Sequence, residues 1–208
     1  MGLRKTHTPE ALREVIEREH PRDADGLLAQ LQRGDAEQRR WAARDLGAHP
    51  HTSAPLGARL LAEPERSVRQ ALFTSLTAHG SPAAADALLP LLRSEDAELR
   101  NSAIEALSGM PAAVGPRIDT LLRDADPDVR IFTVNLLGEL RHPQVRAWLL
   151  AVLQREAAVN VVAAAIEVLA EVGEPADEPA LRAVATRFAD DAFIGFAAGM
   201  AADRVRAD

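Results

Sequence analysis

The sequence predicts an all-α protein, a right-handed α-solenoid of about six helical hairpins with an N-terminal capping helix. The first reason is a pattern that returns every thirty or so residues along the 208-residue chain, as it does in solenoids. The second is composition, because hydrophobic residues make up 47% of the chain, many of them alanine, while aromatic residues make up only 3%. The third is the presence, between the expected helices, of short segments rich in Gly, Pro and His, which keep consecutive helices antiparallel.

The clearest copy of the pattern is DADPDVRIFTVNLLG at residues 124–138. Asp126 is expected to cap a helix N-terminus, and Pro127 suits the first helical position, where no amide donor is needed. The apolar residues that follow cluster on one side of a helix, and Gly138 permits the helix to end. This stretch therefore predicts the second helix of one hairpin.

Six copies align on one position, which is Arg39, Arg69, Arg100, Arg130, Val162 and Ile194, with spacings of 30, 31, 30, 32 and 32 residues. The residue four places earlier is Asp35, Glu65, Asp96, Asp126, Ala158 and Asp190, and the residue seven places later is Leu46, Leu76, Leu107, Leu137, Leu169 and Ala201. These coincidences indicate six equivalent second helices.

A shorter apolar segment precedes each copy and predicts a first helix, at residues 27–31, 56–61, 87–92, 117–122, 148–153 and 181–185. We expect repeats over approximately residues 27–55, 56–86, 87–116, 117–147, 148–180 and 181–208. Residues 1–26 are expected to form a capping helix, over residues 9–20, and a linker.

The unit L-x-x-L-L-x-D-x-D-P-x-V-R-x-x-A-x-x-x-L-G resembles the short HEAT repeat of the phycobilisome-lyase-like type, over about residues 27–200. The match is best in the third and fourth repeats and weakest in the fifth and sixth, which lack the arginine. In that family the arginine and the preceding acid form a structural ladder between repeats. The resemblance implies this role for Asp35, Arg39, Arg69, Asp96, Arg100, Asp126 and Arg130. The alternative is a row of anion-binding arginines.

In HEAT arrays the second helices line the concave face, so the resemblance and the helical wheel indicate which side chains a partner would meet. The expected partner-binding residues are Arg40, Trp41, Arg44, Gln70, Thr74, Asn101, Glu105, Ile131, Phe132, Asn135, Glu139, Glu167, Glu171 and Phe196. Charge along this face runs from basic in the first repeat to acidic in the last repeats. Trp41 and Phe132 are either hot-spot side chains for a protein or peptide partner or rings that fold back onto neighbouring repeats.

Stacking of the fifth and sixth repeats is expected to rely on apolar contact, because Val162 and Ile194 replace the arginine. Both residues are either ordinary core or part of a surface for a second subunit. We therefore expect a monomer, or a weak dimer through the C-terminal repeats.

Composition excludes several function classes. The absence of Cys excludes disulfides, Cys-ligated zinc and thiol catalysis. A net charge of −7 opposes general binding to nucleic acid or to an anionic membrane surface. No apolar run approaches a membrane span of roughly 18–20 residues, and the N-terminus has no apolar signal core, so we expect a cytoplasmic protein.

No catalytic residue and no cofactor is predicted. His49, His51 and His79 are weak metal candidates, because His79 follows His49 by one repeat and could lie in the same row of loops. The chain lacks a phosphate-binding glycine loop, a G-x-S-x-G elbow and H-E-x-x-H. It also lacks the His-Glu dipeptides with which deoxyhypusine hydroxylases, built from similar repeats, hold iron.

We therefore expect a non-enzymatic scaffold or adaptor for a protein or peptide. One alternative is a cofactor-handling enzyme or lyase subunit similar to the bilin lyases. The other is a HEAT-like DNA-binding protein similar to the alkylpurine DNA glycosylases.

Overall fold

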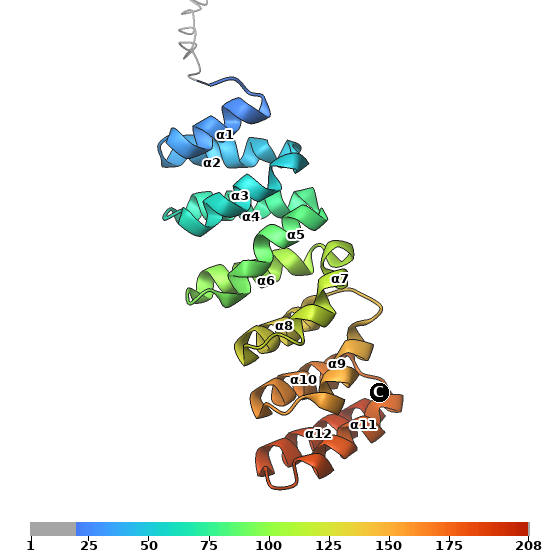
Figure 1. Cartoon of the computed structure of the whole chain (residues 1–208). Coiled ribbons are helices and arrows are strands. Elements are labelled where there is room, and N and C mark those ends of the chain that lie inside the picture. Colours follow the sequence, from blue (N-terminus) through green and yellow to red (C-terminus); the bar gives the residue numbers. More distant parts are fainter. Residues whose placement is uncertain (1–19, 208) are drawn as a thin grey trace, which may run out of the picture.

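A computed structural model describes residues 20–207, and within this range every regular element is helical. Six hairpins stack into an elongated array (Figure 1). Their first helices are α1 (Ala24–Arg33), α3 (Ser53–Ala62), α5 (Pro82–Leu88), α7 (Pro111–Leu121), α9 (Val145–Arg155) and α11 (Glu178–Arg187). Their second helices are α2 (Ala36–Asp45), α4 (Arg66–His79), α6 (Ala97–Ser108), α8 (Pro127–Glu139), α10 (Val159–Val172) and α12 (Ala192–Ala207). The predicted all-α solenoid is confirmed, whereas the capping helix expected over residues 9–20 lies outside the described residues, apart from its last residue.

Aspartate side chains cap the N-termini of several second helices. The Asp35 carboxylate accepts a hydrogen bond from the Gln38 amide at 2.8 Å, and that of Asp126 accepts one from the Asp128 amide at 2.9 Å. The Asp96 carboxylate accepts from two amides of its own helix. Each carboxylate satisfies donors that the first turn of a helix leaves unpaired. The predicted cap at Asp126 is confirmed.

The last repeat has a different register from the one expected. Asp191, not Asp190, is the cap of α12, because its carboxylate accepts from the Phe193 and Ile194 amides at 3.1 and 3.0 Å. The Gly195 amide donates to the Asp191 carbonyl, just as the Arg130 amide donates to that of Asp126. Gly195 therefore occupies the arginine position, and Ile194 is a buried core residue like Val129. Either of two consecutive aspartates can cap a helix, so the sequence alone does not separate the two registers.

The first helices begin three to six residues before the apolar segments that predicted them. Most of their first turns begin with small or polar residues or with proline, for example Pro82 in α5 and Pro111 in α7, whereas α9 begins with the buried Val145. Proline is well tolerated at this position because the amide it lacks would be unpaired there. Pro90 lies within the apolar segment 87–92, where α5 ends and the 3-10 helix η3 (Leu89–Arg93) begins. Further 3-10 turns are η1 (Leu46–Ala48), η2 (Pro50–Thr52) and η4 (Pro175–Asp177).

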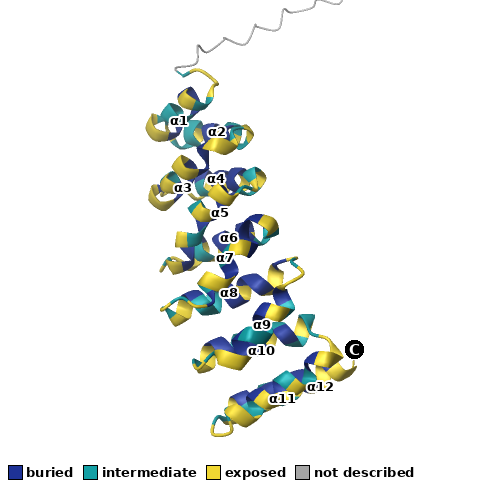
Figure 2. Ribbon diagram, turned by 45° about the vertical axis from the view of Figure 1, so that its right-hand side comes forward, coloured by how far each residue is buried: buried dark blue, intermediate teal, exposed yellow. Residues whose placement is uncertain are grey.

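The core is continuous from Leu27 to Val205. The second helices contact one another in chain order from α2 to α12, which forms a single column along the array. Figure 2 shows the buried faces turned toward the interior of this stack and the exposed faces turned outward. The aligned residues Leu46, Leu76, Leu107, Leu137 and Leu169 are all buried, as are Ala201 and, in the corrected register, Ala202 of α12. A single hairpin could not bury such faces alone, so neighbouring repeats stabilise each other.

Candidate functional site: the second-helix face and the arginine ladder

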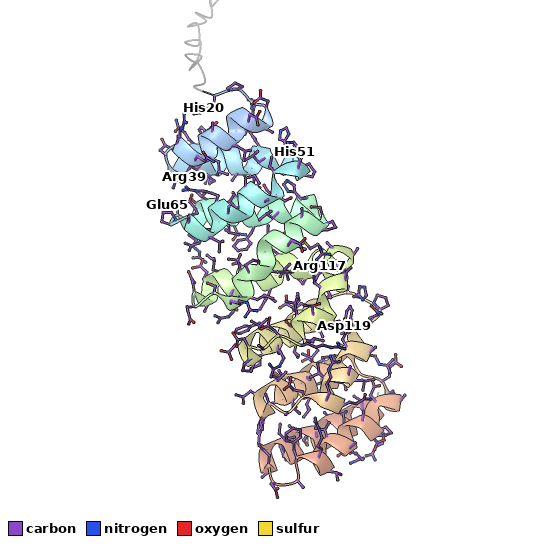
Figure 3. The ribbon with its side chains drawn as sticks, viewed as in Figure 1. His20, Arg39, His51, Glu65, Arg117 and Asp119 are labelled. Carbon is purple, nitrogen blue, oxygen red and sulfur yellow. The ribbon has the colours of Figure 1, made fainter. Side chains whose placement is uncertain are left out.

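The first arginine of the aligned position connects two repeats. Arg39 donates from Nε and Nη2 to the two carboxylate oxygens of Glu63, at 2.9 and 2.7 Å, and from Nη1 to the Gly34 carbonyl at 3.0 Å. Glu63 directly follows α3 in the second repeat. Figure 3 shows Arg39 and Glu65 at the same edge of the array, where the hairpin turns lie, and His51 at the opposite edge.

The Glu63 carboxylate is fully buried and receives further hydrogen bonds. Arg59 donates to it from Nε and Nη2, at 2.9 and 2.6 Å, and the Glu65 amide donates at 3.0 Å. Burial by itself would raise the pKa of Glu63, but the hydrogen bonds from Arg39, the Glu65 amide and Arg59 together lower that pKa to about 2. Glu63 is therefore an ionised structural carboxylate at neutral pH.

Arg130 makes the same kind of link between the fourth and fifth repeats. It donates from Nε and Nη2 to Glu156, at 2.8 and 3.1 Å, and from Nη1 to the Asp124 carbonyl at 2.7 Å. Glu156, like Glu63, comes from the end of the first helix of the next repeat. Arg39 and Arg130 thus pair with acids of the next repeat, whereas Asp35 and Asp126, four places before them, where the resemblance suggested the partner, cap their own helices.

Arg69 and Arg100 make other contacts than Arg39 and Arg130 do. Arg69 donates to the carbonyls of Glu63 and Pro64, and its guanidinium lies 3.8 Å from the Glu98 carboxylate. Arg100 donates to the Ser94 carbonyl at 2.7 Å, and its guanidinium lies over the Phe132 ring, 4.2 Å from the centroid. This is a cation–π contact between repeats. All four ladder guanidinium groups are therefore engaged within the protein.

We use the term second-helix face for the fourteen residues expected to bind a partner. Eleven of them are exposed, and they are spread over all six second helices: Trp41, Arg44, Gln70, Thr74, Asn101, Glu105, Asn135, Glu139, Glu167, Glu171 and Phe196. The other three, Arg40, Ile131 and Phe132, are half-buried. The face is thus a continuous row of accessible side chains on the column of second helices.

An open hollow of about 600 Å³ lies in the middle of this face, between α6 and α8. It is lined by Glu98, Asn101, Ser102, Glu105 and Glu139. Three carboxylates make the hollow acidic, and an amide and a hydroxyl add hydrogen-bonding groups. Among the three carboxylates, Glu98 is the one that the sequence reasoning missed. The helical wheel could have found it, because a residue two places before the arginine lies on the same side as Glu105.

The charges of the second-helix face are separated along the array. Arg40 and Arg44 lie on α2, and Glu105, Glu139, Glu167 and Glu171 lie on α6, α8 and α10. Among residues 20–207, none of these six side chains forms an ion pair, while Asp203 of α12 pairs with Arg182 and Arg206. The face therefore offers cationic groups at one end and anionic groups from its centre onward.

Trp41 and Phe132 have different surroundings. The Trp41 side chain is 49% exposed. Phe132 is half-buried, packs against the core and carries the Arg100 guanidinium on its ring. Trp41 can thus offer a large apolar surface to a partner, whereas much of the Phe132 ring is used between repeats.

The three histidines considered as metal ligands do not form a common site. His79 uses both ring nitrogens within the protein, with Nδ1 2.8 Å from the Ser53 hydroxyl and Nε2 3.0 Å from the Leu46 carbonyl. The rings of His49 and His51 lie edge to face with centroids 5.9 Å apart. In the described range, no three His, Cys, Asp or Glu side chains converge as a metal site would require.

Between residues 20 and 207, no helix combines the length and the apolar character needed to cross a membrane. The longest helix, α12, has 16 residues and carries several charged side chains.

Several solved structures are similar to this chain. An engineered protein from a structural genomics consortium matches with a TM-score of 0.44 and 18% identity, covering 89% of this chain and 97% of that one. A designed armadillo repeat protein in complex with the peptide (KR)4 matches with a TM-score of 0.41 and 16% identity, covering 86% and 98%. The complex of CpcE and CpcF of phycocyanin lyase from Nostoc sp. PCC7120 matches with a TM-score of 0.31 and 18% identity, covering 94% and 99%. No curated protein matches the sequence.

The family of the chain follows from the repeats themselves. A model of HEAT repeats matches residues 24–108 and 115–197, which include helices of all six hairpins. The hairpins, the continuous column of second helices and the arginine links between repeats agree with this match. The chain belongs to the HEAT-repeat family.

Proposed function

We propose that this chain is a non-enzymatic scaffold or adaptor that binds a protein or peptide on its second-helix face. The observation that carries the proposal is the unbroken row of exposed side chains over six second helices. Repeat proteins use such extended surfaces for recognition, because a stack of similar units presents many contacts along one direction. Trp41 at one end and the central hollow supply two places where a bound segment could anchor.

The charge separation favours a partner with a matching order of charges. Basic side chains of the partner would lie over the carboxylates of α6, α8 and α10, and acidic ones near Arg40 and Arg44. Electrostatic matching of this kind sets orientation and association rate. A partner of the opposite order would bring like charges together.

The test begins with capture of partners from the native host on immobilised protein, with the Trp41→Ala variant in parallel. For an identified partner, titration calorimetry should show that Trp41→Ala weakens binding by about 2 kcal/mol, as hot-spot truncations do. Leu61→Ala is the matched control, since Leu61 is also exposed, at 61%, but lies on the first helix α3. A partner that binds both variants as tightly as the wild type would contradict the proposal.

Phe132→Ala should behave differently from Trp41→Ala in thermal unfolding. Loss of the ring removes the contact with Arg100 and leaves a gap against the core, so the unfolding temperature should fall. Trp41→Ala should leave it nearly unchanged, because the indole is half exposed. A large drop for Trp41→Ala would assign this side chain to packing and remove the proposed anchor.

A further inference from the structure

Helix α12 carries an unusual amount of exposed apolar surface. Six large hydrophobic side chains are exposed in the described residues, and three of them lie on α12: Phe193 at 65%, Phe196 at 69% and Met200 at 57%. Their spacing of three and four residues places them on one face of the helix. A large apolar cluster on one helix face marks an interaction site more often than scattered residues do.

The same helix has a shallow side next to this cluster. A Cβ atom added at Gly195 or Gly199 would meet no neighbouring atom within 4 Å. The two glycines are four residues apart and so lie on one side of α12, beside Phe196. A second helix could therefore approach the α12 backbone closely along this side.

Internal repeats show what this side of a second helix normally does. In the first repeat the residue four places after the arginine is Ala43, which is fully buried. Ser75 of α4 packs there and donates to the Ala43 carbonyl at 2.7 Å. The equivalent residue of α12 is Gly199, because Gly195 occupies the arginine position. The glycine side of α12 thus corresponds to the surface that receives the next second helix elsewhere in the array.

We propose that α12 of a second copy of this chain occupies this surface, antiparallel to the first and related to it by a two-fold axis. In this arrangement Phe196 of each copy lies opposite Met200 of the other, and the glycines let the backbones approach. Charge complementarity supports an antiparallel pair. Acidic residues Asp190 and Asp191 precede α12, and Arg204 and Arg206 lie in its last turn.

The antiparallel arrangement places Asp190 of one copy opposite Arg206 of the other, twice in each dimer. It also sets the two helix dipoles against each other, which is the favourable orientation. A parallel arrangement would instead place like charges together at both ends. The interface is isologous, since each copy contributes the same surface.

The size of the contact predicts a weak dimer. A helix of 16 residues is about 24 Å long, and a single helix pair of this length covers less than the roughly 800 Å² per partner of a stable interface. Association should therefore be concentration-dependent. Sedimentation velocity over about 5 to about 500 µM, a range suited to small interfaces, should show a mass that rises from 22.4 kDa toward twice that value.

Gly199→Leu separates self-association from folding. A Cβ atom at position 199 meets no neighbouring atom within 4 Å in a single copy, and leucine is a better helix former than glycine, so the unfolding temperature should not fall. The same leucine would block the close approach of a second α12, and the dissociation constant should rise at least tenfold.

Phe196→Arg should abolish the dimer, because it places a cation in the apolar contact. Leu61→Arg is its control and should leave the dimer intact, because it also replaces an exposed apolar residue by a cation but lies outside α12.

A charge exchange tests the antiparallel geometry. Asp190→Arg and Arg206→Glu should each weaken the dimer, because each variant faces like charges in its own homodimer. An equimolar mixture of the two should recover wild-type association, since both contacts of the mixed dimer again join opposite charges. Neither residue belongs to the second-helix face, so the result is independent of the proposed function.

Three outcomes would overturn the proposal. Wild-type protein that stays monomeric over the whole range would exclude self-association. A dimer that Gly199→Leu leaves intact would place the interface elsewhere. Single charge variants that weaken the dimer but do not complement each other would exclude the antiparallel pairing.

Discussion

The junction between the first and second repeats and the junction between the fifth and sixth hold together in different ways. At the first junction, the buried Glu63 carboxylate binds two guanidinium groups, those of Arg39 and Arg59. At the second junction, Val162 stands in the arginine position and is buried among apolar residues. Arg187 of α11 reaches back there, donating to the Glu156 and Leu153 carbonyls, both at 2.7 Å.

The comparison shows which requirement the repeat has to satisfy. The carbonyl six places before the arginine position lies at the hairpin turn and needs a donor. In the second, third and fourth repeats this carbonyl belongs to Glu63, Ser94 and Asp124, and the arginine of the same repeat binds it. In the fifth repeat it belongs to Glu156, and Arg187 of the next repeat binds it. The repeat thus has to supply a hydrogen-bond donor for this carbonyl, and the arginine that supplies it can belong to the same repeat or to the next one.

The largest expected effect is acid unfolding. Glu63, Glu156, Asp177, Asp124 and Asp86 all have pKa values below their ordinary ones, with Glu63 at about 2. A lowered pKa in the folded state means that stability is full above the ordinary pKa and is lost as the pH falls toward the folded value. Glu63 alone contributes about 3 kcal/mol at neutral pH. Denaturant titrations should therefore show the free energy of unfolding falling steeply between about pH 5 and pH 2. A flat profile there would contradict the assignment.

Glu63→Gln breaks the first junction directly. The substitution leaves two guanidinium groups without a buried counter-charge, and the free energy of unfolding should fall by about 3 kcal/mol. The acid dependence should also become shallower, because one of the shifted carboxylates is gone. Glu65→Gln is the matched control, since Glu65 is exposed and its side chain makes no cap hydrogen bond. Equal losses for the two variants would exclude a special role for Glu63.

Arg187→Ala tests the substitute arginine of the second junction. Two hydrogen bonds to carbonyls are lost, and the free energy of unfolding should fall by about 1.5 kcal/mol. Amide exchange should accelerate mainly in α10 and α12, leaving α2 and α4 protected. Arg182→Ala on the same helix is the control, because Arg182 pairs only with surface carboxylates. A loss that spreads to the first two repeats would contradict a local role.

The fold was predictable from the sequence because its signals repeat. The leucines from Leu46 to Leu169 recur at one offset from the arginine position, and all are buried. The register of α12 was not predictable, because Asp190 and Asp191 are equivalent as caps in the sequence and only hydrogen bonding selects Asp191. The starts of the first helices were also missed, since most of their first turns begin with small or polar residues or proline.

The arginine links were only partly predictable. The alignment marks Arg39 and Arg130 as special, but their partners Glu63 and Glu156 lie 24 and 26 residues further along the chain. The sequence has many such acids, and it does not show their burial, which sets Glu63 and Asp177 apart from the other acids in the described residues. The contact of Arg100 with Phe132 likewise joins two repeats, so a helical wheel of one repeat does not show it.

The smallest expected effect on stability comes from Glu98→Gln, which sharpens the comparison between buried and exposed links. Glu98 pairs with Arg66 at 2.6 Å and lies 3.8 Å from Arg69, but its side chain and that of Arg66 are largely exposed. Exposed pairs typically contribute about 0.5 kcal/mol or less, so the free energy of unfolding should hardly change. Glu98 also lines the central hollow, and the same variant should weaken binding of a partner whose basic groups lie there. Glu63→Gln and Glu98→Gln make the same chemical change at successive repeats and differ mainly in burial. If Glu98→Gln instead destabilises the protein as much as Glu63→Gln, then charge pairing rather than burial controls these junctions.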